Sequence, residues 1–543
     1  MLALLPLATL TIADVYLQRL WQDSAMAASQ AGYHQDGVDA RLDDLSPETR
    51  ARRRQFLHDF QNARSQNVDE LADQQLVENA IALELLDIEE AHDYERRADQ
   101  PLDALGDTFF QMTVRDYAPL DRRRADVIAR LQAVRRYLAQ AQANLKTYVD
   151  VFAEAAKDDG EGLISYFDHE VIEKFAVGKE ADQVKMAVGS AKVAVKKYLE
   201  FVERELPKKS RGSFRYRQDW YEKRFRPYLQ TDNSPAQVLA LAQKRMAEIH
   251  AEMKLLAKQV SPSAEVRQAL GQVAEETIRP DRFLDEVRRE LGEARRFIEQ
   301  KKLLPLGTHD NLQVIETPPF LRSLLGVAAF DGAPPLEPAL GAYYYVTPFP
   351  SDWPKAKLES KLREYNRFAL TLITIHEAMP GHYVQFEHAN RVEPESRRVL
   401  RWVLGANSFI EGWAVYTQDL LTDAGFLGGD ARLKLAARKL ELRAVANAIL
   451  DIRLHTEALS DDMALKFLTE EAFQERTEAE QKLRRAKLSV TQLCSYFVGG
   501  ESWKALRHDA EKRAGKNFDL AAFHQQALSH GSVPLTVLRK FIE

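Results

Sequence analysis

The sequence of 543 residues has little cysteine and no long uncharged run. Its single cysteine, Cys494, excludes an internal disulfide and a metal cluster held by several thiolates, and it is more typical of the cytosol than of an oxidising compartment. No uncharged stretch approaches the roughly 18 residues that span a bilayer, so we expect no transmembrane helix.

The N-terminal segment MLALLPLATLT is apolar, but it lacks the basic start of a signal peptide, because the first Lys or Arg is Arg19. This pattern indicates a segment that leads into a helix, in a cytoplasmic protein. A trimmed signal peptide, and with it a periplasmic or secreted protein, is the alternative.

A surplus of positive charge is also missing. The chain has 75 Lys and Arg residues against 81 Asp and Glu residues, a formal net charge of -6. Proteins that bind nucleic acid or an anionic membrane need a basic face that displaces counterions, so we expect no nucleic acid and no membrane as partner. The short basic runs at 50–54 and 122–124 lie beside acidic residues and indicate solvated helix faces.

Several catalytic signatures are absent as well. The sequence has no G-x-S-x-G nucleophile elbow, no P-loop, no G-x-G-x-x-G motif and no fixed-period repeat. These absences argue against a serine hydrolase of that type, a P-loop nucleotidase, a dinucleotide-dependent enzyme and a solenoid. They leave metal-dependent hydrolysis as the enzymatic chemistry to compare with the motifs that are present.

Helical periodicity covers most of the chain. From residue 12 to about residue 302, apolar residues recur at spacings of three and four, as in LQAVRRYLAQAQANL. Nine of the 21 prolines then fall between Pro305 and Pro354, which excludes long helices there and predicts an extended, loop-rich segment. We therefore expect one intertwined unit with three regions: N-terminal helices (1–304), a Pro-rich loop and edge-strand segment (305–354), and C-terminal helices (355–543).

The segment ITIHEAMPGHYVQ begins like the zinc-peptidase signature H-E-x-x-H, but Pro380 stands where that signature has its second histidine. The available pair, His376 and His382, is six residues apart, which on an unbroken helix means a turn of about 240° and a rise of about 9 Å, too far to share a metal. Pro380 cannot donate a hydrogen bond to the carbonyl of His376, and Gly381 allows unusual backbone angles. We expect a break or bulge that turns His382 back toward His376.

A third ligand should come from another element, and Glu411 in FIEGWAVYTQDLL lies on a helical pattern 29 residues after His382. Two imidazoles and one carboxylate leave a fourth position open for water, which is the arrangement of a catalytic zinc site. Glu377 would be the general base that takes a proton from this water. His388, on the same run as His382, is a reserve ligand.

The spacing alone leaves a second interpretation open. A His-Glu pair is common on helices, Pro-Gly often simply ends a helix, and a glutamate before glycine usually faces solvent. The identity of the metal is open too, because imidazole and carboxylate ligands suit Zn²⁺, Mn²⁺ and Co²⁺. We choose one Zn²⁺ per chain because zinc is the commonest.

Several blocks together carry a resemblance to a known family. HEAMPGHYVQ, EGWAVYTQDL, GAYYYVTPF, LCSYFVGGESWKALR and FHQQALSHGSVPLTVL resemble the bacterial family filed as domain of unknown function 885, which is grouped with the zincin-like, gluzincin-type metallopeptidases. The likeness extends from about residue 12 to the C-terminus and is strongest after residue 310. It implies a mainly α fold, that of a zincin-like helical metallopeptidase with a deep cleft and a small β-sheet near the active site.

The resemblance also assigns roles to single residues. The family pattern maps onto His376, His382 and Glu411 as metal ligands, without a gap or a substitution. It maps onto Glu377 as the catalytic base.

Hydrolysis also needs a donor aimed at the developing oxyanion. The candidates are Tyr496, beside the glycines of SYFVGG that allow a close approach of the chain, and His455. Asp451 lies four residues before His455 and would orient its ring. The alternative is a buried Asp-His pair with a structural role only.

Substrate-binding candidates come from two segments. GAYYYVTPF is aromatic and β-branched and is closed by Pro348, which predicts a short strand near a sheet edge. Zincins bind extended substrates along such a strand, so Tyr344 and Tyr345 are candidate contacts; alternatively, they pack in the core. Arg443 would bind a substrate carboxylate, as in a carboxypeptidase or dipeptidase, or would form an interhelical salt bridge.

We therefore expect a zinc-dependent peptidase that hydrolyses the peptide bonds of short peptides with a metal-activated water. One alternative is a zinc amidase that acts on a non-peptide or modified-peptide amide. Another is a catalytically inactive helical peptide-binding protein, against which the intact Glu377 counts. A monomer and a homodimer are both open.

Overall fold

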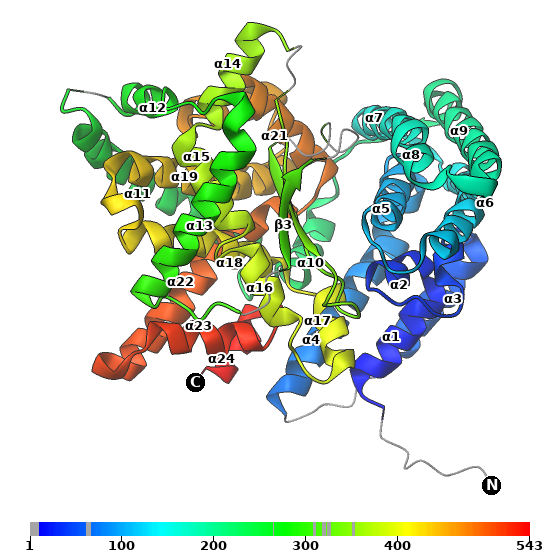
Figure 1. Cartoon of the computed structure of the whole chain (residues 1–543), viewed down its shortest axis with the longest axis horizontal. Coiled ribbons are helices and arrows are strands. Elements are labelled where there is room, and N and C mark those ends of the chain that lie inside the picture. Colours follow the sequence, from blue (N-terminus) through cyan, green and yellow to red (C-terminus); the bar gives the residue numbers. More distant parts are fainter. Residues whose placement is uncertain are drawn as a thin grey trace. The chain divides into compact units, whose positions relative to one another are not determined.

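The structure, a computed structural model, describes residues 10–60, 67–263, 265–307, 311–317, 322, 327–349 and 353–542. The sequence predicts that the N-terminal segment MLALLPLATLT leads into a helix or is a trimmed signal peptide. Its first nine residues lie outside the described residues. The chain is mainly helical, as predicted (Figure 1). No helix in the described part of the chain combines the length and the apolar character that a membrane span requires.

Contacts within the chain divide it into two compact units. The first contains the residues up to Arg211 together with Pro334–Leu340 and Arg391–Gly405. The second contains Gly212–Ala333, Gly341–Asn390 and Ala406–Glu543.

The two units have the following elements. Those of the first unit are α1 (Ile12–Asp23), α2 (Ala25–Gln30), α3 (Pro47–Asp59), α4 (Val68–Leu86), α5 (Gln100–Val114), α6 (Leu120–Asn144), β1 (Thr147–Tyr148), α7 (Asp150–Tyr166), α8 (Ile172–Phe175), α9 (Ala181–Arg204), β2 (Ser210–Arg211) and α17 (Glu395–Val403). The helices of the second unit are α10 (Gln218–Leu229), α11 (Pro235–Val260), α12 (Val266–Ala274), α13 (Phe283–Lys301), α14 (Lys355–Glu364), α15 (Arg367–Glu377), α16 (His382–Ala389), α18 (Asn407–Asp423), α19 (Ala431–Thr456), α20 (Asp461–Lys466), α21 (Arg476–Leu488), α22 (Ser495–Ala514), α23 (Leu520–Ser529) and α24 (Leu535–Phe541).

The last helices before the Pro-rich segment belong to the second unit. α11 packs extensively along α19, and Arg245 on α11 forms an ion pair with Glu441 on α19, with 2.9 Å between Nε and Oε1. Composition placed these helices in the N-terminal region 1–304, but their packing places them with the C-terminal helices. The compact units thus cut across the three expected ranges, because interhelical packing and not proline content defines them.

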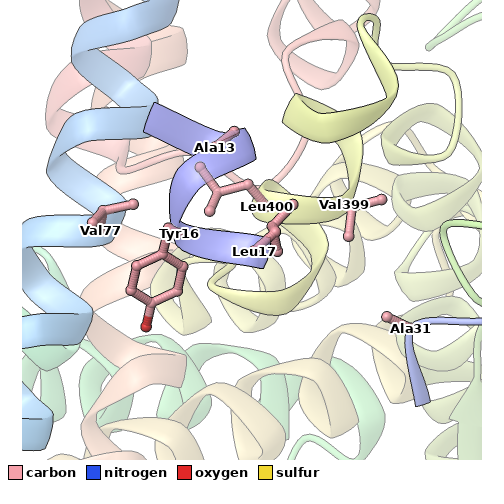
Figure 2. Close-up of a cluster of buried hydrophobic side chains, with 7 residues drawn as sticks. All are labelled: Ala13, Tyr16, Leu17, Ala31, Val77, Val399 and Leu400. Atoms are coloured by element: carbon pink, nitrogen blue, oxygen red, sulfur yellow. The ribbon is translucent and has the colours of Figure 1, made fainter. Parts of the chain in front are cut away.

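One core of the first unit joins helices that are far apart in the sequence (Figure 2). Tyr16 and Leu17 of α1 pack with Val77 of α4 and with Val399 and Leu400 of α17, and all five side chains are buried. Burying one such side chain contributes roughly 1.5–3 kcal/mol. This cluster therefore fixes α17, which follows the motif region in the sequence, to the N-terminal helices.

The second unit also contains a three-stranded sheet of β3 (Leu312–Glu316), β4 (Ala328–Asp331) and β5 (Ala342–Val346), in the order β3-β5-β4. β5 pairs in parallel with β3 and antiparallel with β4. GAYYYVTPF thus forms a strand as predicted, but the prediction that it lies at an edge is wrong. The neighbouring residues Tyr344 and Tyr345 are 0% and 2% exposed because both faces of this central strand are covered.

α18 and α22 approach each other backbone to backbone at two glycines. A Cβ atom on Gly412 would lie 2.4 Å from the carbonyl carbon of Gly499, and one on Gly499 would lie 2.0 Å from the carbonyl oxygen of Ser408. Any larger residue at either position would push the helices apart. The contact places Glu411, next to Gly412, and Tyr496, about one turn before Gly499, on adjacent helices.

Candidate metal centre

The motif helix is interrupted between its two histidines. α15 ends at Glu377 and α16 begins at His382, so the break predicted at Pro380 and Gly381 is present. The Gly381 N–H donates to the carbonyl oxygen of Ile375 at 2.9 Å. This hydrogen bond folds the linking residues back against the last turn of α15.

The break brings two imidazoles together. The rings of His376 and His382 meet edge to face with 4.8 Å between their centroids. Trp413 on α18 donates its indole N–H to the carbonyl oxygen of Pro380 at 2.8 Å. The helix that carries Glu411 therefore also holds the segment that links the two histidines.

Glu411 completes a group of three potential ligands. Its Oε2 atom lies 3.6 Å from Nε2 of His376 and 3.6 Å from Nε2 of His382. Bonds of about 2.1 Å in a tetrahedral zinc site place ligand atoms about 3.4 Å apart, so the observed spacing fits a metal ion. Glu411 Oε2 is buried and has no hydrogen-bond partner in the part of the chain that the structure describes. A cation between the three side chains would satisfy this oxygen.

The electrostatics of the group suit metal binding. Burial, together with the charge of His376, lowers the pKa of His382 to about 4, which keeps its ring neutral. Burial alone would raise the pKa of Glu411, but its interactions with the two histidines lower it to about 2. Burial also opposes a charged His376, but the contact with Glu411 and the charge of Glu377 raise its pKa overall. A bound cation would displace this proton.

Glu377, the predicted base, is held beside these ligands by a strand. Its Oε2 atom accepts a hydrogen bond from the Phe330 N–H on β4 at 3.1 Å. Burial raises the pKa of Glu377 to about 7, with His376 opposing and Glu411 adding to the rise. The carboxyl group can therefore bind and release a proton near neutral pH, as a general base must.

His376 and Glu377 line a cavity of about 200 Å³. Two residues predicted from the sequence, Arg443 and Tyr496, line it as well. The Tyr496 ring is stacked on His376 with 6.5 Å between centroids, and its hydroxyl accepts a hydrogen bond from Arg485 Nη2 at 3.2 Å. The structure thus brings together the predicted base, one candidate ligand, the oxyanion candidate and the carboxylate-binding candidate.

Four further polar residues of the cavity wall were not predicted from the sequence: Gln418, Asn447, Lys482 and Arg485. Asn447 lies one turn after Arg443 in a largely apolar stretch of α19. Lys482 and Arg485 belong to the basic stretch KLRRAK, which by itself indicates a solvated helix face. The sequence shows that these side chains are charged, but it does not show that they line a cavity.

His455 and Asp451 lie elsewhere. His455 is stacked on Tyr221, with 5.2 Å between centroids. Asp451 accepts hydrogen bonds from the Tyr221 hydroxyl at 2.7 Å and from the Thr491 N–H at 3.1 Å. The prediction that Asp451 orients His455 is therefore wrong, because a buried tyrosine from α10 takes the carboxylate. Within the described residues, His455 is also not among those that line the cavity with Glu377.

Neither the two strand tyrosines nor the reserve ligand belongs to the three-residue group among the described residues. The Tyr344 hydroxyl lies 3.2 Å from Thr374 Oγ1 on α15. Tyr344 and Tyr345 are both part of the core, which corrects their expected role as substrate contacts. His388 is buried on α16 but is not part of the three-ligand group found among the described residues.

We predict that Gly381→Ala destabilises the protein. A Cβ atom at this position would lie 1.8 Å from the carbonyl oxygen of His376, so the backbone must shift. Overpacking of this kind costs about 1–3 kcal/mol of unfolding free energy. Gly271→Ala is the matched control, since Gly271 is a helical glycine with open space at its Cβ position. Chemical denaturation that gives equal stabilities for the two variants would show that the close approach at Gly381 is not required.

A family model described as "Bacterial protein of unknown function (DUF885)" matches residues 26–542. A solved structure described as a "putative lipoprotein of unknown function" from Shewanella oneidensis is 27% identical, with a TM-score of 0.81 over 97% of this chain and 98% of that chain. The "putative lipoprotein" from Colwellia psychrerythraea is 17% identical and has a similar fold, with a TM-score of 0.80 over 98% and 97%. None of the curated proteins compared with the chain matches it. The chain therefore belongs to the bacterial DUF885 family of proteins of unknown function.

Proposed function

We propose that the protein is a metal-dependent peptidase of the zincin-like class that hydrolyses short peptides. The observation that carries the proposal is the meeting of three ligands, His376, His382 and Glu411, across a broken helix. The three side chains would hold one divalent cation, Zn²⁺ as the commonest and Mn²⁺ or Co²⁺ as alternatives. When bound, the cation supplies a Lewis acid that activates water and polarises the scissile carbonyl.

Glu377 is the general base in this proposal. Its carboxylate takes a proton from the attacking water and passes it to the departing amine, as a positioned general base does. The hydrogen bond from the Phe330 N–H orients this carboxylate. Tyr496, on the wall of the same cavity, donates a hydrogen bond from its hydroxyl to the oxygen on which negative charge develops.

β4 takes the edge-strand role that we had expected for GAYYYVTPF. The Thr347 N–H donates to the Val327 carbonyl, so in this antiparallel register the main-chain groups of Ala328 and Phe330 face away from β5. The Phe330 N–H therefore points away from β5 and donates its hydrogen bond to Glu377. An extended peptide bound along β4 would therefore lie next to the base.

Short unmodified peptides incubated with protein that carries one equivalent of Zn²⁺ test the proposal, with products identified by mass spectrometry. We expect cleavage that a chelator abolishes and added Zn²⁺ restores. Turnover of a modified or non-peptide amide, with the peptides intact, would instead indicate the amidase alternative. Tight binding of peptides that the metal-loaded protein leaves unchanged would indicate the inactive peptide-binding protein.

Tyr496→Phe is expected to lower kcat by about 10²- to 10³-fold, the usual effect of removing one oxyanion donor. The phenylalanine ring keeps its place against His376, so the metal content should not change. Tyr198→Phe is the matched control, because the Tyr198 hydroxyl donates to the Ala98 carbonyl at 2.8 Å in the first unit. Equal kcat values for the two variants would remove Tyr496 from the mechanism.

The location of the protein is a separate proposal. Both solved structures carry the description "putative lipoprotein". By analogy we place this protein outside the cytoplasm, which favours the exported alternative over the cytoplasmic location expected from the sequence. Cell fractionation tests this, and recovery of the protein in the cytosolic fraction alone would refute it.

A further inference from the structure

The cavity beside His376 and Glu377 has a positively charged wall. Arg443 projects from α19, and Lys482 and Arg485 lie one turn apart on α21. Among the described residues that line the cavity, Glu377 is the single carboxylate. A concave site with two guanidinium groups, one lysine and one carboxylate attracts anions.

The carboxylates near this wall do not neutralise it. Glu364 forms an ion pair with Lys439, with 2.9 Å between Oε2 and Nζ. Glu478 pairs closely with Lys361 and lies 3.8 Å from Arg443 Nη2. Each of these carboxylates therefore has a lysine of its own, and the positive charge of the cavity wall remains in excess.

Lys482 is the most buried of the three basic residues, with 6% of its surface exposed. Burial, together with the charges of Arg443 and Arg485, holds the pKa of Lys482 well below its usual value, and Glu478 only partly opposes this. Within the described residues, no carboxylate forms an ion pair with Lys482. Lysine is almost never buried without a partner, so a carboxylate that enters the cavity would supply the missing counter-charge.

Asn447, an uncharged residue of the same cavity wall, is a second indication that the cavity binds a ligand. It is 4% exposed, lines the cavity one turn after Arg443, and its Oδ1 atom has no hydrogen-bond partner among the described residues. Buried amides are nearly always hydrogen-bonded. An N–H group of a bound peptide would satisfy Oδ1, and the Asn447 NH₂ group would donate to a peptide oxygen.

We propose that this cavity anchors a carboxylate of the peptide next to the metal centre. The substrates are then short peptides that carry a free C-terminal carboxylate or an acidic side chain at the adjoining position. The inference rests on the proposed peptidase function. Arg443 and Lys482 bind the carboxylate through charge-assisted hydrogen bonds, and Asn447 binds the neighbouring amide.

Calorimetric binding to the full-length, zinc-loaded Glu377→Gln protein tests this inference, because that variant should turn a peptide over at least about 10²-fold more slowly than the wild type. One probe pair is N-acetyl-alanyl-alanine as the free acid and as the amide. The other pair is N-acetyl-alanyl-glutamic acid amide and N-acetyl-alanyl-glutamine amide. In at least one of the two pairs, we expect the charged probe to bind at least about tenfold more tightly than the neutral probe, a difference of about 1.4 kcal/mol in binding free energy.

Variants show whether the cavity causes the preference, since a free carboxylate also has affinity for zinc itself. Lys482→Met in the same background should abolish the preference, and Arg443→Met is the second variant if the first does not fold. Lys487→Met is the matched control: Lys487 lies on the same helix, pairs with Asp461 at 2.6 Å, and is not among the lining residues described.

A preference for the free acid assigns the cavity to the C-terminus, and a preference for the glutamic acid probe assigns it to an acidic side chain. Equal binding of charged and neutral probes, or a preference that survives both Lys482→Met and Arg443→Met, would overturn the inference even if the wild type cleaves peptides. Charge-dependent binding that Lys482→Met abolishes, with no cleavage by the wild type, would instead overturn the peptidase proposal and leave the carboxylate site in place.

Discussion

Glu377→Gln is expected to reduce kcat by about 10²- to 10⁴-fold, the contribution of a positioned general base. Glutamine retains an oxygen that can accept the Phe330 N–H bond, but it cannot take up a proton. Glu377 is not one of the three ligands, so the zinc content should stay at one equivalent. The measurement is steady-state hydrolysis of a short peptide, with elemental analysis of the same preparation.

Glu290→Gln is the matched control for this variant. Glu290, on α13, is 3% exposed and accepts a hydrogen bond from Thr371 Oγ1 on α15 at 2.7 Å. Burial raises the pKa of Glu290 to about 8, so the group is protonated at neutral pH and glutamine imitates it. The kcat of Glu290→Gln should therefore stay near the wild-type value. A Glu377→Gln protein with intact metal and wild-type kcat would show that another group is the base.

His382→Ala is expected to abolish metal binding. Only His376 and Glu411 would remain, and the loss of affinity should exceed the 10- to 100-fold that follows removal of an outer-shell partner. A cation that binds the folded state stabilises it by mass action, so excess Zn²⁺ should raise the Tm of the wild type and not that of the variant. Elemental analysis of protein purified without chelators should find one equivalent of metal in the wild type and none in His382→Ala.

His388→Ala separates the two possible second imidazole ligands. His388 lies on the same helix as His382 but outside the ligand group, so its replacement should leave the metal in place. Metal lost from His388→Ala and kept in His382→Ala would exchange the two assignments. Wild-type protein that binds no metal, even after Zn²⁺ is added, would favour the inactive peptide-binding protein.

The break between the two histidines could be predicted because its causes are local. Pro380 has no N–H to donate to the His376 carbonyl. Gly381 lacks the Cβ atom that would otherwise lie 1.8 Å from that carbonyl oxygen. Both causes act within six consecutive residues of the chain, so a local pattern in the sequence is enough to reveal them.

The strand position and the histidine partner could not be predicted in this way. β5 is central because β3 and β4, two other segments of the chain, pair with its opposite sides. The uninterrupted apolar run in GAYYYVTPF was itself a sign of a strand buried on both faces. Similarly, a spacing of four suggested an Asp451–His455 pair, but Tyr221 from another helix takes that carboxylate.

By itself, the sequence determined the mainly helical class, the broken motif helix and the residues of the candidate metal centre, because each depends on side-chain types at short spacings or on a recognisable family pattern. Only the tertiary structure decided that β4 is the edge strand beside Glu377. It also decided that Arg443 and Asn447 share one cavity with Lys482 and Arg485. These residues lie on two helices separated in the sequence, and their meeting depends on how α19 and α21 pack, which the spacing within either helix does not specify.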